Sequence, residues 1–139
     1  MKSSLSLMIF TSLIALSPSA LADKVPPQPL QAWVGHYSCS LTQFDGLGEK
    51  YTYPDFRCEI SQQGDSYTLE KTSGSQRFRG KITANENGFS FNGIFFCPWG
   101  ECTSDLTGVY TYNGNNQFTG EIHAPSEPHD YQIVNLKRL

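Results

Sequence analysis

Charged side chains are scarce in this chain, and the sequence has no long hydrophobic run. Among 139 residues only 10 are basic and 13 acidic, which gives a formal net charge of −3. A nucleic-acid binder normally concentrates basic residues on one face, so this balance argues against that class. The longest apolar run, residues 5–16, is shorter than the roughly 20 residues that a transmembrane helix needs. We therefore expect neither a nucleic-acid partner nor a transmembrane anchor.

Motifs for catalysis are also missing. The chain has no Gly-x-Ser-x-Gly elbow, which nucleophilic hydrolases of one large class require. It has only three histidines, the usual residues of acid–base and metal chemistry. We expect no enzymatic activity and no cofactor. One alternative stays open, a metal-dependent hydrolase, because potential metal ligands are densest in a single short segment: Glu121, His123, Glu127, His129 and Asp130.

The N-terminus has the pattern of a secretory signal peptide. A single positive residue, Lys2, precedes the apolar run, and Pro18 and the small-residue motif of residues 20–22 follow it. This order predicts a signal peptide over residues 1–22. Residues 23–31 are rich in proline and predict an extended arm. The remaining residues, 32–139, have the length of a single domain. The predicted product is exported, to the periplasm or the extracellular medium.

Four cysteines occur after the predicted cleavage site, and an even count in an exported domain indicates disulfides. Cys39 and Cys58 both fall on the apolar phase of an alternating pattern. A hairpin centred near position 48.5 would place them opposite each other, which predicts the pair Cys39–Cys58 and leaves Cys97–Cys102. Four residues separate the second pair, whereas metal and redox motifs usually have two. A structural disulfide is favoured there, with a metal site or a redox couple as alternatives.

Turn signals divide residues 32–139 into short alternating segments without a convincing helix. Asn-Gly and other glycine-containing turns favour tight hairpins, because their residues adopt positive φ. Eight strands at a spacing of about twelve residues predict an antiparallel meander. The expected strands are 33–42, 52–61, 66–71, 76–84, 88–97, 102–112, 117–124 and 130–137.

A repeated motif of an apolar residue, any residue, Gly, any residue and an apolar residue sharpens this prediction. It occurs five times, centred on Gly35, Gly80, Gly93, Gly108 and Gly120. Glycine inside a strand lets a sheet bend and leaves room for an aromatic ring of the next strand. We therefore predict an all-β fold, a small antiparallel barrel of about eight strands with two disulfides; a two-layer sandwich is the alternative. The expected inward residues are Trp33, Tyr37, Leu41, Phe56, Ile60, Tyr67, Leu69, Phe78, Ile82, Phe89, Phe91, Phe95, Leu106, Tyr110, Phe118, Ile122 and Tyr131.

The two ends of this domain resemble those of the calycin barrels, the lipocalin and avidin group. A tryptophan, Trp33, opens the first expected strand, and an arginine, Arg138, closes the last. The resemblance implies that the arginine packs across the tryptophan and seals one end of an eight-stranded barrel. A barrel of this size is filled by side chains or holds one small ligand. A solid core is favoured here, and a carrier of a small apolar ligand remains an alternative function.

The favoured functional region is a surface around the second cysteine pair. The outward phase of strand 88–97 becomes apolar at its end, and a closed loop beside it holds a tryptophan. Exposed apolar residues beside a rigid tryptophan are typical of a binding hot spot. The alternative is that the tryptophan plugs the barrel. We predict an exported protein that binds a protein or envelope component, as an enzyme inhibitor would, through Ile94, Phe96, Trp99, Glu101 and Val109.

Overall fold

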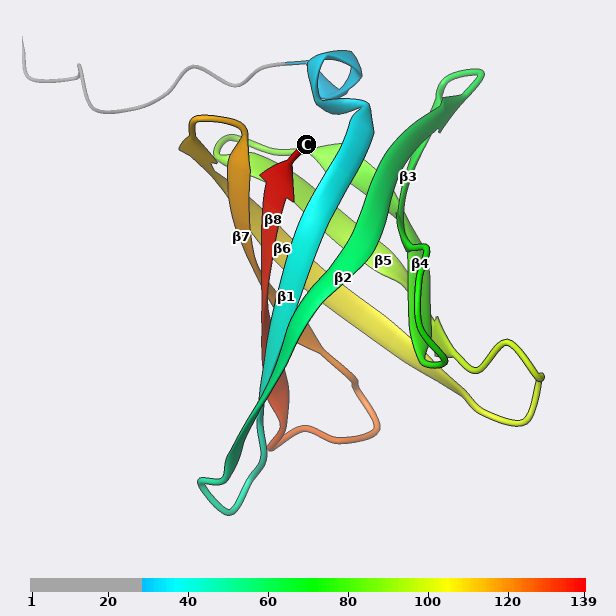
Figure 1. Cartoon of the computed structure of the whole chain (residues 1–139), viewed down its shortest axis with the longest axis vertical. Helices are drawn as coiled ribbons and strands as arrows, with labels where there is room; N and C mark the ends of the chain where they lie inside the picture. The colour runs from blue at the N-terminus through cyan, green and yellow to red at the C-terminus, as the bar shows by residue number, and fades with distance from the viewer. Residues whose placement is uncertain (1–28) are drawn as a thin grey trace, which may run out of the picture.

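The computed structural model describes residues 29–139. The predicted signal peptide and residues 23–28 of the predicted arm lie outside the described residues. Eight antiparallel strands pair in chain order and close into a barrel, because the last strand pairs with the first (Figure 1). The predicted barrel is confirmed, and the sandwich alternative is wrong. The elements are η1 (Leu30–Trp33), β1 (Gly35–Phe44), β2 (Lys50–Gln63), β3 (Ser66–Lys71), β4 (Arg77–Ala84), β5 (Gly88–Phe96), β6 (Thr103–Gly114), β7 (Gln117–His123) and β8 (Tyr131–Arg138).

The first element differs from its prediction. Trp33 belongs to a single turn of 3-10 helix, η1, rather than to the first strand, and this turn also takes up the last residues of the predicted arm. Its backbone bond from Ala32 N–H to the Pro29 carbonyl measures 2.9 Å. Within residues 29–139, no helix is long and apolar enough to span a membrane.

The barrel is filled by the side chains that alternate inward along each strand. Twelve of the predicted inward residues are buried, and four more pack against them. The prediction that Tyr131 points inward is wrong, since its side chain is 36% exposed. Val134 and Leu136, which the prediction omitted, are the inward residues of β8, and their phase turns Tyr131 outward. The core is mostly aromatic, and its rings meet edge to face or offset, as at Trp33–Phe118 with centroids 4.9 Å apart.

The repeated glycines let rings and strands approach closely, as predicted. A Cβ at Gly80 would lie 2.6 Å from the ring of Phe91 on the next strand, and one at Gly120 would overlap the ring of Tyr110. At Gly93 the obstacle is backbone, because the neighbouring strand β4 lies so close that a Cβ would overlap the Arg79 carbonyl oxygen. Glycine at these positions is therefore a packing requirement of the closed barrel.

Both predicted disulfides are present, Cys39–Cys58 and Cys97–Cys102. The register argument behind the first was wrong, because Cys39 pairs with Phe56 and Cys58 with Tyr37. The hairpin turn is centred nearer to residue 47, where the Asp45 carboxylate accepts bonds from backbone N–H groups, and β2 carries an extra residue at a bulge. The cysteines are diagonal neighbours with Cα atoms 6.1 Å apart, within disulfide range.

One end of the barrel is sealed. The helical turn η1 lies across it beside the C-terminus (Figure 1), and Trp33 projects inward with 2% exposure. The Arg138 guanidinium donates to the carbonyls on both sides of Trp33, those of Ala32 at 2.8 Å and Val34 at 2.9 Å. The Tyr37 hydroxyl donates to the Trp33 carbonyl, and burial raises the pKa of Tyr37 to about 12 despite the nearby guanidinium. We call this the closed end.

Candidate functional site

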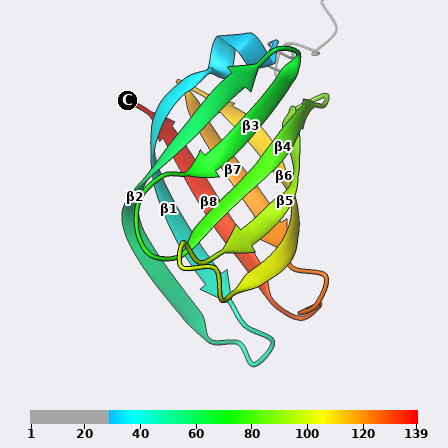
Figure 2. The same cartoon turned by 90° about the vertical axis from the view of Figure 1, so that its right-hand side faces the viewer.

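The opposite end of the barrel, which we call the open end, is framed by four connections. They are the β1–β2 turn, the β3–β4 loop, the disulfide-closed β5–β6 loop and the β7–β8 loop. The β1–β2 turn and the β7–β8 loop project below the barrel in Figures 1 and 2. Two of them are tied together, because the Gly46 N–H donates to the Asp130 carboxylate at 2.9 Å. The β5–β6 loop is held by its disulfide and by a bond from the Gly100 N–H to the Cys97 carbonyl. Much of this rim is therefore fixed by covalent and hydrogen bonds.

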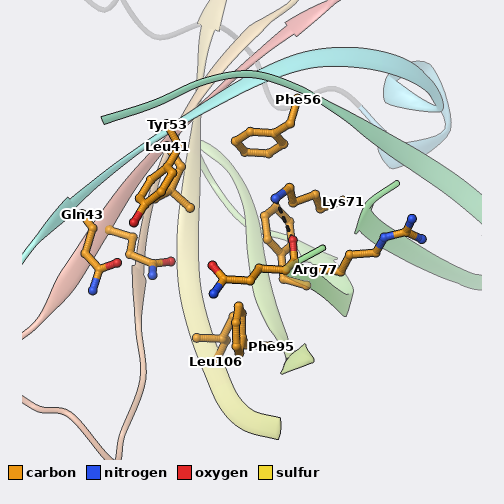
Figure 3. Close-up of a pocket in the computed structure, with 11 residues that line it drawn as sticks. Leu41, Gln43, Tyr53, Phe56, Lys71, Arg77, Phe95 and Leu106 are labelled. Carbon is orange, nitrogen blue, oxygen red and sulfur yellow. Dashed lines mark hydrogen bonds between the residues drawn. The ribbon is translucent and has the colours of Figure 1, made fainter. Parts of the chain in front are cut away.

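Inside the open end the inward phase changes from apolar to polar. Gln43 and Gln132 pair across β1 and β8 at inward positions beyond the core, and Tyr51 pairs with Gln43 from β2. From these residues a cavity of about 60 Å³ extends deeper into the barrel (Figure 3). It opens outward into a recess of about 320 Å³. The two spaces share six lining residues, Gln43, Tyr53, Gln76, Phe95, Leu106 and Gln132.

The volume of the inner cavity limits what the barrel can hold. A water molecule in the liquid takes about 30 Å³, and pockets for drug-sized ligands measure about 300–1,000 Å³. The inner cavity therefore has room for a small group and not for a whole apolar ligand. Side chains therefore fill most of the barrel, as the favoured solid core predicts, and the carrier of a small apolar ligand stays an alternative hypothesis.

A lysine stands in the wall of this cavity. Lys71 occupies the inward phase of β3 after the half-buried Tyr67 and the buried Leu69. Its ammonium donates to the Gln76 carbonyl at 2.6 Å and lies 4.6 Å from the centroid of the Phe56 ring (Figure 3). Burial, with a smaller contribution from the Arg77 guanidinium, lowers the pKa of Lys71 from its usual range. The cavity thus holds a cation that is partly removed from water.

The predicted loop tryptophan lies at the rim. Trp99 is 59% exposed, so it does not plug the barrel. Glu101 in the same loop is exposed as well. Because the disulfide closes this loop over six residues, the tryptophan is presented from a short, covalently restrained support.

The other predicted surface residues divide into two places. Ile94 and Phe96 lie next to the loop on the outer face and are half-buried, with the Arg79 guanidinium 5.4 Å from the Phe96 ring. Val109 is 53% exposed but pairs with Ser90, four residues along β5 from Ile94. At about 3.3 Å per residue, this places Val109 roughly 13 Å from Ile94 along the strand. The structure therefore brings Ile94 and Phe96 to the loop and leaves Val109 apart from it.

The group of potential metal ligands is dispersed. His123 and Glu121 are hydrogen-bonded on the surface, with Nε2 and Oε1 3.0 Å apart, and this is the one contact within residues 29–139 at ion-pair distance. His129 lies against Gly46 at the β1–β2 turn, and Asp130 is occupied by the bond described above. Across the described part of the chain, no three His, Cys, Asp or Glu side chains are grouped so that they could hold a metal ion.

An aromatic cluster on the outer face near the rim was not predicted. The rings of Phe44 and Tyr131 stack with centroids 4.7 Å apart, and the His123 ring lies 6.2 Å from that of Tyr131. The Lys50 ammonium lies 5.9 Å from the Phe44 centroid. Phe44 and Tyr131 point outward from β1 and β8, and their rings meet because these two residues pair across the strands. Sequence alternation alone did not provide that register.

The polar residues of the cavity were missed although a signal existed. Continuing the inward phase of β1, β3 and β8 past the apolar residues leads to Gln43, Lys71 and Gln132. Tyr53 joins them only because the bulge in β2 shifts its phase by one residue. Strands of ten and fourteen residues, β1 and β2, are longer than the eight of β4 and β8, so their ends extend past the core. An inward polar residue near such a strand end is the sequence signal of a barrel mouth.

Comparison with known proteins gave a family match. No curated protein matches the sequence. One family model, described as domain of unknown function (DUF4893), matches residues 8–123, from the predicted signal peptide through the end of β7. Because the match covers most of the chain, the protein belongs to the DUF4893 family.

Proposed function

We propose that the protein is an exported, non-enzymatic binding protein whose open end engages a protein or envelope component. One observation carries this proposal: exposed large hydrophobic side chains gather at that end. Five of the seven such residues in the described chain lie on its turns and strand ends, and these five are Leu47, Tyr51, Tyr53, Trp99 and Tyr131. Exposed apolar groups gathered in one region typically mark an interaction site.

The composition of the rim supports a protein-type interface. Aromatic residues are enriched at binding hot spots because they bury a large area with few rotatable bonds. Trp99 and Tyr51 supply such rings at the rim, and the hydrogen bond from Tyr51 to Glu49 raises the pKa of the phenol. The restrained loop lowers the conformational entropy lost on binding. A rim of this kind suits capture of a surface better than catalysis.

Export is supported by the disulfides. Such bonds persist in oxidising compartments and are rare in the cytosol, and both pairs are formed here. The predicted signal peptide over residues 1–22 also supports export. We place the protein in the periplasm or the extracellular medium, where an inhibitor of an enzyme or an envelope-associated factor would meet its partner.

Replacing Trp99 by Ala tests this proposal. We expect affinity capture from the exported compartment to recover a partner with the wild-type protein, and Trp99→Ala to weaken that binding about 30-fold, the effect of a 2 kcal/mol hot spot. The melting temperature should change by no more than about 2 °C, because the side chain is mostly exposed.

Val109→Ala is the matched control, since Val109 is similarly exposed but lies away from the rim. It should leave both partner binding and melting temperature unchanged. Partner binding that survives Trp99→Ala, or that is lost with Val109→Ala, contradicts the proposal. A large fall in melting temperature for Trp99→Ala would show that the ring supports the fold instead.

A further inference from the structure

We propose that the cavity at the open end binds a carboxylate carried on a short apolar stem, with the Lys71 ammonium as its counter-charge. This inference rests on the proposed function of the open end and names the chemistry of the group that enters it. Its basis is a cation in the wall of a cavity that contains no acid.

Lys71 has donors to spare. An ammonium offers three N–H donors, and the structure uses one of them for the Gln76 carbonyl. Figure 3 shows the side chain reaching in from the barrel wall beside Phe56, so the free donors lie next to the cavity. Partial burial has already removed part of the water around the ammonium, as the lowered pKa shows. An arriving anion would replace the lost solvation.

No acidic residue lines the inner cavity beside Lys71, and Glu127 lines the outer recess instead. Within residues 29–139, the one contact at ion-pair distance joins His123 to Glu121 and does not involve Lys71. Arg77 also borders the cavity, and its Nε donates to the Gly74 carbonyl at 3.0 Å. Its guanidinium points away from the cavity in Figure 3, but its charge adds to the positive potential at Lys71. The cavity therefore favours a negative guest.

The remaining lining selects a carboxylate rather than a phosphate. Gln43 and Gln132 add neutral amide donors at the cavity entrance, and a carboxylate has several acceptor positions to match them. Leu41, Phe78 and Leu106 make much of the remaining wall apolar, and Tyr53 and Gln76 line it as well. A phosphate dianion would lose much more hydration in such surroundings, and no guanidinium fork points in to replace it.

The two volumes suit a carboxylate with a stem. The inner cavity of about 60 Å³ has room for a carboxylate and one or two methylene groups. The outer recess of about 320 Å³ accommodates the rest of an alkyl or side-chain stem along Tyr53, Phe95 and Leu106, and polar residues that include Glu127 line its other parts. An acidic side chain or a chain terminus of a protein partner has this form, and so has a small free carboxylic acid.

Nuclear magnetic resonance titration of the exported protein, with both disulfides formed, tests the inference with defined probes. Hexanoate should give saturable shifts confined to residues near 41–43, 71 and 132. Hexanamide, its neutral counterpart, and inorganic phosphate should give none at the same concentrations. Lys71→Gln should weaken hexanoate binding at least tenfold, while Lys71→Arg should retain most of it. Lys81→Gln, which removes an exposed lysine from the outer face, should have no effect.

Two results would overturn the inference. One is hexanamide binding as tightly as hexanoate, and the other is hexanoate binding unchanged by Lys71→Gln. A measurement on the unsubstituted protein guards against misfolding of the variants: saturating hexanoate should raise the pKa of Lys71, followed by the NMR shifts of its side chain. An unchanged pKa of Lys71 also counts against the site.

Failure of this inference and failure of the proposed function give different results. If hexanoate does not bind but Trp99→Ala still weakens partner binding about 30-fold, only the carboxylate site is wrong. If hexanoate binds but Trp99→Ala leaves partner binding intact, the proposed role of the rim is wrong. Hexanoate that displaces a captured partner assigns the carboxylate to that partner. Binding without displacement assigns the site to a free small carboxylate.

Discussion

Gly93→Ala is expected to destabilise the barrel by about 3 kcal/mol or more, at the upper end of overpacking effects. Gly93 faces Gly80 across β4 and β5, and the added methyl would overlap the Arg79 carbonyl oxygen and the Gly80 Cα. Both obstacles are backbone atoms of a paired strand, so no side-chain rotation relieves the overlap. Thermal unfolding followed by circular dichroism should show the melting temperature falling by about 10 °C or more.

The neighbouring residue supplies the control for this prediction. Asn92 precedes Gly93 on β5 and is exposed, so Asn92→Ala should change the melting temperature by only a degree or two. If Gly93→Ala melted like the wild-type protein, β4 and β5 would not approach as closely as the structure shows. The explanation of the repeated glycines as close-packing positions would then be wrong.

Trp33→Ala should cost about 3–5 kcal/mol, the usual effect of removing a buried aromatic side chain. The ring is 2% exposed and contacts the rings of Phe89, Tyr112 and Phe118, with centroids 4.9–6.2 Å apart. Its loss would leave a hole beneath η1 and free the segment that Arg138 holds. Urea unfolding should show the midpoint fall, with the amplitude of the transition retained.

The chain contains its own comparison for this prediction. Trp33 and Trp99 are its two tryptophans, one buried at the closed end and one exposed at the open end. Trp33→Ala should lower stability strongly, whereas Trp99→Ala should leave it nearly unchanged and reduce partner binding. Equal effects of the two substitutions on stability would contradict the distinction between a sealed end and a working end.

Alternation and glycine placement were sufficient to predict the barrel. The five repeated motifs identified inward faces on five segments, and twelve of the seventeen proposed inward residues are buried. The prediction failed where local backbone geometry intervenes. The bulge in β2 and the turn at Asp45 moved the β1–β2 register by two residues, which alternation cannot detect because the same face stays inward. The cysteine pairing survived because a disulfide also joins diagonal neighbours.

The candidate site was harder to predict than the fold. Trp99 was identified from its position in a cysteine-closed loop, which is a local feature. The cavity requires residues from seven strands, and its lysine follows an ordinary run of inward residues on β3. Lys71 could lie in the core, at the open end or in solvent, depending on how far along the barrel the side chains fill the interior. Strand pairing across the whole sheet sets that position. Sequence patterns on single strands do not contain this information.

Photo-cross-linking from two exposed leucines tests most directly whether the open end is the working end. Leu47 lies in the β1–β2 turn at the open end with 91% exposure, and Leu139 lies at the closed end with 65% exposure. A photoreactive amino acid replaces one or the other, and the cells are illuminated with the protein in its exported compartment. The proposed function predicts a cross-linked partner from position 47 and none from position 139. Cross-links from position 139 alone, or equally from both positions, would contradict it.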